Sequence, residues 1–207
     1  MGEVPHPDRC AEAIYEFFGL DGACPGAPEA LEAKLEAGGR LQTVRRVLGG
    51  KEAMLEHTLW GWQIWVSRRL GASDRHFAVL HELGEWWLGR LAFRGPEREA
   101  TADRIAAALV APRQRYRPLA DQLGFDPPGL SQHFAATQTC LALRFGEVTG
   151  RPVLVVDRTQ AWARGDPFVW TPEDRDLFNL ARGPLPPSVQ RIRLTDCRGR
   201  VALTALG

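Results

Sequence analysis

Hydrophobic residues in the first 150 positions recur mainly at helical spacing. Ala11, Ile14, Phe17 and Phe18 fall on one helix face, and Gly19 follows as a stop signal. The same spacing, bounded by glycine, proline and capping residues, predicts further helical stretches at residues 28–39, 74–89, 96–112, 118–124 and 130–149, the last broken near Ala136 and Thr137. The stretch that ends near Gly89 is apolar nearly all round, which predicts a central, buried helix.

Two strands are predicted before residue 150. Residues 40–48 read as one strand and residues 58–70 as another. In the second, Trp60, Trp62, Ile64 and Val66 share one parity, as in a half-buried strand. These two strands predict a small N-terminal sheet beside the helices.

The pattern changes after Gly150. Strands are predicted at 151–157 and within 159–170, and a helix at 171–183 that Thr171 caps and Pro172 begins. Residues 189–196 and 198–206 read as a hairpin around Cys197. The predicted fold class is therefore α+β, with a mainly helical body over 1–150 and a C-terminal α+β extension over 151–207.

Composition narrows the functional classes only slightly. The 207 residues are 44% hydrophobic and 25% charged, with a net charge of +1, which is ordinary for a globular protein and indicates no particular partner. The four cysteines are far apart and form no C-x-x-C pair, which argues against a zinc ribbon or a redox motif. No apolar run has membrane-span length and the first residues lack signal-peptide features, so we expect a cytoplasmic protein with reduced thiols and no membrane partner.

The segment "HELGE", residues 81–85, carries the candidate chemistry. Positions i and i+4 of a helix project from one face, so His81 and Glu85 can hold one ion. Glu82 lies about 100° round the helix, where it can take a proton from water as the glutamate of zinc peptidases does. A third ligand must come from elsewhere, and "EREATAD" offers Glu99 and Asp103 on one face of the next helix.

These segments together resemble the ImmA/IrrE family of gluzincin-type metallopeptidases. The resemblance rests on "RHFAVL", "HELGE" and "EATADRIAAALVAP", and it covers roughly residues 10–150. It implies a zincin-like helical body, with His81, Glu85 and Glu99 as metal ligands and Glu82 as general base. It also implies that Asp103 holds His81 by its other ring nitrogen. The implied substrate is a regulatory protein such as a repressor, whose cleavage would switch on stress or mobile-element genes.

Glu85 departs from the family, which has a second histidine at this position. A site of one imidazole and two carboxylates is neutral with a divalent ion, acidifies bound water less, and favours harder cations such as manganese more than a two-histidine site does. Zinc is the expected cofactor, with manganese or no metal as alternatives. Without an ion, Glu82, Glu85 and Glu99 repel one another.

Other hypotheses stay open beside a peptidase. The chain could be a degenerate peptidase that binds a protein partner. Trp60, Trp62 and Trp65 could line a groove for an added peptide strand, although packing in the core and at the sheet edge is the simpler interpretation. His76 fits a surface position in the first helical turn better than a ligand position. Residues 130–149 resemble a helix-turn-helix, but only Gln138 and Arg144 offer an outward polar contact, which argues against a nucleic-acid partner.

Overall fold

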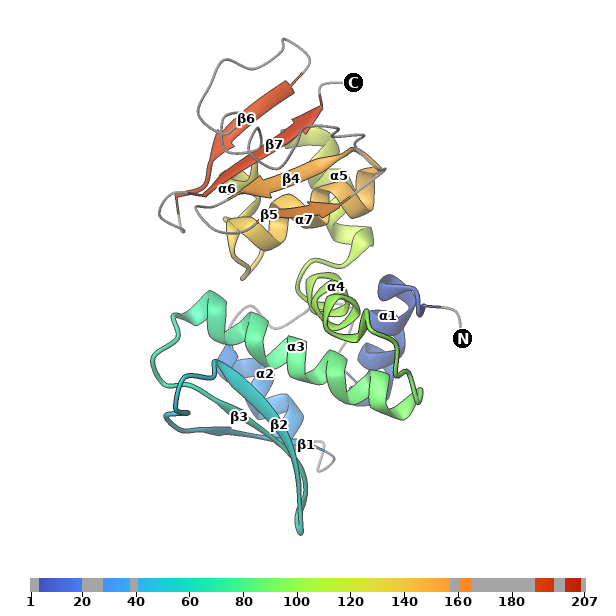
Figure 1. The fold of residues 1–207 in the computed structure, drawn as a ribbon, viewed down its shortest axis with the longest axis vertical. Coiled ribbons are helices and arrows are strands. Elements are labelled where there is room, and N and C mark those ends of the chain that lie inside the picture. Colours follow the sequence, from blue (N-terminus) through green and yellow to red (C-terminus); the bar gives the residue numbers. More distant parts are fainter. Residues whose placement is uncertain are drawn as a thin grey trace. The chain divides into compact units, whose positions relative to one another are not determined.

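The computed structural model describes residues 4–19, 28–37, 41–156, 161–164, 189–195 and 200–205. Helices and short strands occur in separate runs along the chain, so the protein is α+β and mostly helical, as the sequence predicts (Figure 1). Its internal contacts divide it into two compact units. We call residues 1–112 with 134–136 the N-terminal unit, and residues 113–133 with 137–207 the C-terminal unit.

The N-terminal unit combines a three-stranded sheet with four helices. Its strands lie in the order β1-β3-β2, with β1 parallel and β2 antiparallel to the central β3. The sequence did not predict β2, which forms one edge of this sheet. The elements are α1 (Pro7–Phe18), α2 (Pro28–Ala37), β1 (Leu41–Arg45), β2 (Ala53–Thr58), β3 (Gly61–Val66), α3 (Ala72–Arg90) and α4 (Arg98–Val110).

The central strand β3 only partly follows the predicted parity. Ile64 and Val66 are fully buried. Trp60, however, lies in the turn between β2 and β3 with 86% of its surface exposed, and Trp62 is 38% exposed. The aromatic residues extended the apparent alternation into the turn, so the prediction of one strand from residue 58 is wrong at its start.

Helix α3 is central in this unit, as its apolar composition predicts. It packs against α4 on one side and against β2 and β3 on the other (Figure 1). Leu80, Leu83 and Leu88 are fully buried in the core that results. Neither Ser73 nor Asp74 caps α3, because the helix begins earlier, after the extended residue Gly71.

Helix α4 begins later than the sequence predicts. Its N-cap is Glu97, so Pro96 precedes the helix instead of occupying its first turn. Glu99 consequently lies in the first turn of α4 and Asp103 one turn further along. The two acids therefore lie on the same side of this helix.

The C-terminal unit contains short helices and a four-stranded antiparallel sheet in the order β5-β4-β7-β6. The predicted pairing of the last two strands is confirmed, with Val189 opposite Ala205. The helix predicted at 171–183 and the turn around Cys197 lie outside the described residues. The elements are α5 (Arg113–Leu123), α6 (Pro127–Leu130), α7 (Gln138–Thr149), β4 (Val153–Val156), β5 (Ala161–Arg164), β6 (Val189–Arg193) and β7 (Val201–Ala205).

The division by packing falls after Pro112, not near Gly150 as the sequence predicts. Helix α7 packs against β4 and β5, which joins residues 138–149 to the strands that follow them. The change of pattern at Gly150 therefore marks a helix C-cap with left-handed backbone, and not a boundary between compact units. None of the described helices is both long enough and apolar enough to cross a membrane.

Candidate metal centre

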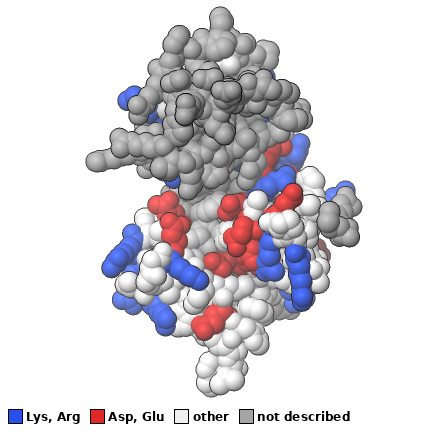
Figure 2. Space-filling model, viewed as in Figure 1, with Lys and Arg blue, Asp and Glu red and all other residues white. Residues whose placement is uncertain are grey.

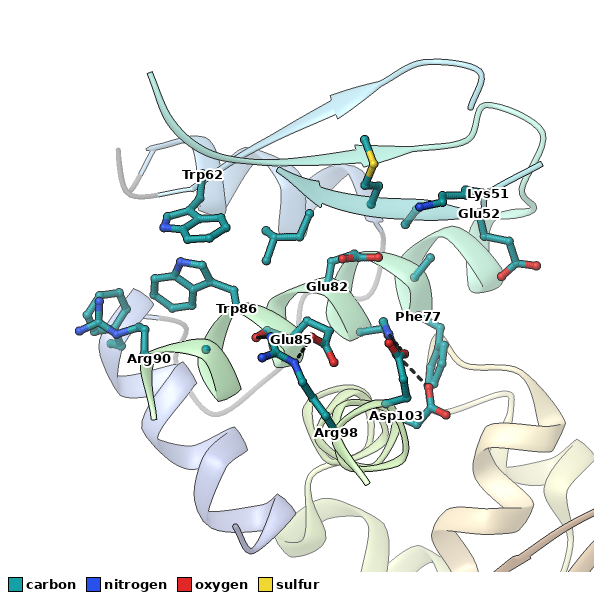
Figure 3. A pocket seen from close by; sticks show the side chains of 18 residues that line it. Lys51, Glu52, Trp62, Phe77, Glu82, Glu85, Trp86, Arg90, Arg98 and Asp103 are labelled. Carbon is teal, nitrogen blue, oxygen red and sulfur yellow. Dashed lines mark hydrogen bonds and ion pairs between the residues drawn. The ribbon is translucent and has the colours of Figure 1, made fainter. Parts of the chain in front are cut away.

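Three residues of the HELGE motif on α3 border a pocket of about 1380 Å³. His81, Glu82 and Glu85 contribute to this pocket from α3, and Glu99 and Asp103 from α4. The opposite wall comes from Glu52 and from β2 (Figure 3). The structure thus brings all five predicted site residues to one pocket within the N-terminal unit.

Two acids of α4 contact His81, one at each ring nitrogen. His81 Nδ1 lies 2.9 Å from Asp103 Oδ1 and His81 Nε2 lies 3.4 Å from Glu99 Oε2. Because a carboxylate only accepts hydrogen bonds, Nδ1 donates to Asp103, and this contact fixes the orientation of the ring. The other nitrogen, Nε2, points toward Glu99.

His81, Glu85 and Glu99 converge on one point. Each offers a ligand atom, and these atoms lie within 4.8 Å of one another. Glu85 Oε1 is buried, and none of the described residues donates a hydrogen bond to it. This oxygen is therefore available to a cation. One imidazole nitrogen and two carboxylates are a donor set that zinc and manganese accept, so the residues present fit a divalent cation.

Glu82 is half-buried beside this cluster. Burial raises the pKa of its carboxyl group, and the charges of Glu85 and Glu99 add smaller increases. His81 and a hydrogen bond from the Leu55 backbone lower this pKa, but the net shift is upward. A carboxylate with a raised pKa is a stronger base than an exposed one, which suits proton transfer near neutral pH. Leu55 belongs to the edge strand β2, so Glu82 lies where α3 meets this edge.

The ionisation of His81 reflects the same crowding of acids. Burial lowers its pKa, but the hydrogen bond and charge of Asp103, followed by the charges of Glu82 and Glu99, outweigh burial, and the net direction is upward. Several carboxylates thus act on one imidazole. The site attracts positive charge, as a cation site requires.

Glu85 also pairs with Arg98, a contact that the sequence analysis missed. Arg98 Nε lies 2.5 Å from Glu85 Oε2, and Arg98 Nη2 donates to the Glu85 carbonyl oxygen at 2.9 Å (Figure 3). The available signal was an arginine directly before the candidate ligand Glu99, in a site with surplus acids. One oxygen of the substituted residue is therefore held by a guanidinium group.

Charges of both signs line the pocket. Its acids are Glu52, Glu82, Glu85, Glu99 and Asp103, and its cations are Lys51, Arg90 and Arg98. On the surface, acidic side chains gather over the middle of the N-terminal unit, with lysine and arginine on either side (Figure 2). Within the pocket, the acidic side chains outnumber those of lysine and arginine.

Gly84 sets the close approach of α3 to α4 beneath the site. A Cβ added here would lie 3.1 Å from the Ala102 carbonyl oxygen and 3.4 Å from the Ile105 side chain. We expect Gly84→Ala to lower the free energy of unfolding by about 1–3 kcal/mol, because the helices must separate slightly, and to weaken metal binding by moving Glu99 away from His81. Chemical denaturation and metal titration measure the two effects.

Gly89→Ala is the matched control for this substitution. Gly89 is also within α3, but its added Cβ would meet only the end of the Arg98 side chain, at 3.8 Å. It should leave stability unchanged or raise it slightly, since alanine is the better helix former. Equal stability of the two variants would contradict the close-packing argument.

Three other sequence-based interpretations have a structural outcome. His76 is fully buried, so the prediction of a surface position is wrong. Trp60 and Trp62 are exposed, so neither belongs to the core; Trp62 packs at the sheet edge against His57 and borders the pocket. Gln138 and Arg144, the residues suggested to face DNA, are only 6% and 1% exposed, because both pack inside the C-terminal unit.

Comparison with known proteins identifies a similar fold. No family model matches the sequence, and no curated protein matches it significantly. The structure resembles a solved structure described as a Mycobacterium tuberculosis transcriptional regulator, with a TM-score of 0.65 and 14% identity over 96% of this chain and 87% of that chain. At this identity the likeness establishes a shared fold, which extends over nearly the whole chain.

Proposed function

We propose that this chain is a metal-dependent peptidase of the ImmA/IrrE type, acting on a regulatory protein such as a repressor. The observation that carries the proposal is the convergence of His81, Glu85 and Glu99, with Asp103 on the remaining nitrogen of His81. These residues come from two different helices. A histidine that only filled an apolar core would not need carboxylates near both of its ring nitrogens.

The proposed ligands are His81 Nε2 and the carboxylates of Glu85 and Glu99. A divalent ion, zinc or manganese, would supply Lewis-acid polarisation of the scissile carbonyl and of the attacking water. Asp103 orients His81 through the 2.9 Å contact to Nδ1, so that Nε2 is the unprotonated nitrogen of the neutral imidazole. The ligand set thus depends on both α3 and α4.

Glu82 is the proposed proton carrier. Its carboxylate, half-buried beside the cluster, takes the proton that the attacking water loses and then delivers it to the leaving amine. The Leu55 backbone hydrogen bond holds the carboxylate at the edge strand. A base at this position lies between the ligands and the wall where a peptide would bind.

The edge of β2 supports a peptide as the substrate class. Ser67 N–H donates to the Glu52 carbonyl oxygen at 2.8 Å, so the peptide groups of Glu52 and, by alternation, Met54 point toward β3. Those of Ala53 and Leu55 point the other way, toward the pocket, and Leu55 reaches Glu82. Outward peptide groups on an edge strand can pair with an extended substrate chain.

Metal content and cleavage test the proposal together. We expect protein purified without chelators or a His-tag to contain zinc or manganese at up to one ion per chain. With that metal restored, it should cut members of a random peptide library, and a chelator should stop the cleavage. Background metal content in folded protein that also fails to bind added zinc or manganese would overturn the peptidase hypothesis.

A binding module without cleavage is the second candidate function. The Glu85–Arg98 ion pair favours it, because one ligand oxygen is already engaged. The solved structure with a similar fold is described as a transcriptional regulator, which fits a regulatory role more than a digestive one. Under this hypothesis a protein partner would bind the pocket and the β2 edge, and neither chelator nor loss of Glu82 would change its binding.

A further inference from the structure

We propose that Arg98 is a positioning residue that holds Glu85 and lowers the affinity of the His81–Glu85–Glu99 site for divalent cations. The site would then load only when free metal is plentiful, so that activity follows metal supply. This inference rests on the proposed function, since it concerns the regulation of the same site. It depends on how Arg98 is fixed and on the charge it brings.

Three acceptors fix the Arg98 guanidinium. Nε contacts Glu85 Oε2 at 2.5 Å, Nη2 donates to the Glu85 carbonyl oxygen at 2.9 Å, and Nη1 donates to the Phe93 carbonyl oxygen at 3.4 Å. Two of these acceptors are backbone atoms, so the group is anchored even apart from the carboxylate. The Glu85 side chain is 14% exposed, so water screens this pair only partly.

The ion pair gives the two carboxylate oxygens of Glu85 different surroundings. Oε2 is engaged by Arg98, while Oε1 is buried and has no hydrogen-bond partner. Glu85 therefore presents one oxygen to the point shared with His81 and Glu99, and its rotation to offer both oxygens is blocked. Arg98 makes Glu85 a fixed, single-oxygen ligand.

The fixed positive charge acts against a bound cation. The carboxylate that neutralises Arg98 is the same one that a metal would draw on, so the two cations compete for it. A histidine at position 85 would leave the guanidinium in place without its carboxylate. The sequence departure at Glu85 and the presence of Arg98 therefore form one feature: an acid that serves both a guanidinium and an ion.

Arg98→Met tests the inference through metal affinity. Because this substitution removes a nearby positive charge, we expect zinc and manganese to bind at least about tenfold more tightly. Competition with a chelator of known affinity measures the change. Arg98→Gln, a second neutral variant that keeps an amide donor, should behave alike if the methionine variant folds poorly. Arg98→Lys keeps the charge and should remain within about threefold of the parent.

Arg94→Met is the matched control. Arg94 is an exposed arginine outside the pocket lining, so its loss changes the net charge equally and should leave affinity unchanged. Unchanged or weaker binding in both neutral variants, beside a parent that binds metal, would overturn the role of Arg98 and leave the peptidase proposal standing. No binding in any folded variant would overturn both.

Discussion

Glu99→Gln is expected to lower the affinity for zinc or manganese by about 100-fold or more. Loss of a residue that merely supports a ligand costs 10–100-fold, so loss of a ligand should cost at least the upper end of that range. The substitution keeps the size of the side chain and removes its charge. Metal content after dialysis and chelator competition measure the effect.

The exposure of Glu99 makes this a clean test. Its side chain is 82% exposed, so the substitution should leave the free energy of unfolding within about 0.5 kcal/mol of the parent. A fall in affinity then reports the ligand and not damage to the fold. The variant also retains the His81–Asp103 contact, because Asp103 reaches the other ring nitrogen.

Glu97→Gln provides the comparison on the same helix. Glu97 is exposed, lies two residues before Glu99 and makes no side-chain cap hydrogen bond, so it loses the same charge at almost the same place. Its metal affinity should match that of the parent. If the two variants bind equally well, Glu99 is no ligand and the proposed ligand set is wrong.

The local part of this site was predictable because it depends only on helix geometry. Glu82 and Glu85 follow His81 by one and four positions, and this spacing fixes the relative directions of the three side chains on α3. The contact of His81 with Asp103 spans 22 residues, and spacing alone could not establish it. That prediction came from resemblance to a family, and the structure confirms the contact without testing the family.

Features that depend on packing were not predictable. Strand β2 has no fully buried residue, so its sequence shows no clear alternation of apolar and polar positions. The Arg98–Glu85 pair requires the approach of α3 to α4, which Gly84 permits. The packing boundary after Pro112 follows from contacts of α7 with later strands, which no local pattern reveals. The last two features are contacts between different elements, and β2 is defined by its pairing with β3.

The presence of a metal would not by itself establish catalysis, and Glu82 separates the two. Glu82 is close enough to the cluster to feel the charges of His81, Glu85 and Glu99, yet its recorded hydrogen bond is to the Leu55 backbone. Its proposed role is proton transfer and not ligation. Metal binding and peptide cleavage should therefore respond differently to its loss.

We expect Glu82→Gln to reduce cleavage by about 100- to 10,000-fold, the usual contribution of a general base, with metal content close to that of the parent. Glutamine matches glutamate in size and can still accept the Leu55 hydrogen bond through its amide oxygen, but it cannot take a proton from water. Initial rates on the best-cleaved library peptide, with the metal content of the same samples, measure both quantities.

Glu52→Gln is the control, because Glu52 borders the same pocket but lies before β2 and outside the ligand cluster. It should lower cleavage by less than about threefold, as expected for an exposed charge. Full cleavage by the Glu82 variant would mean that another group takes the proton. Equal loss of cleavage and of metal would instead make Glu82 a ligand, and the separation of roles within HELGE would be wrong.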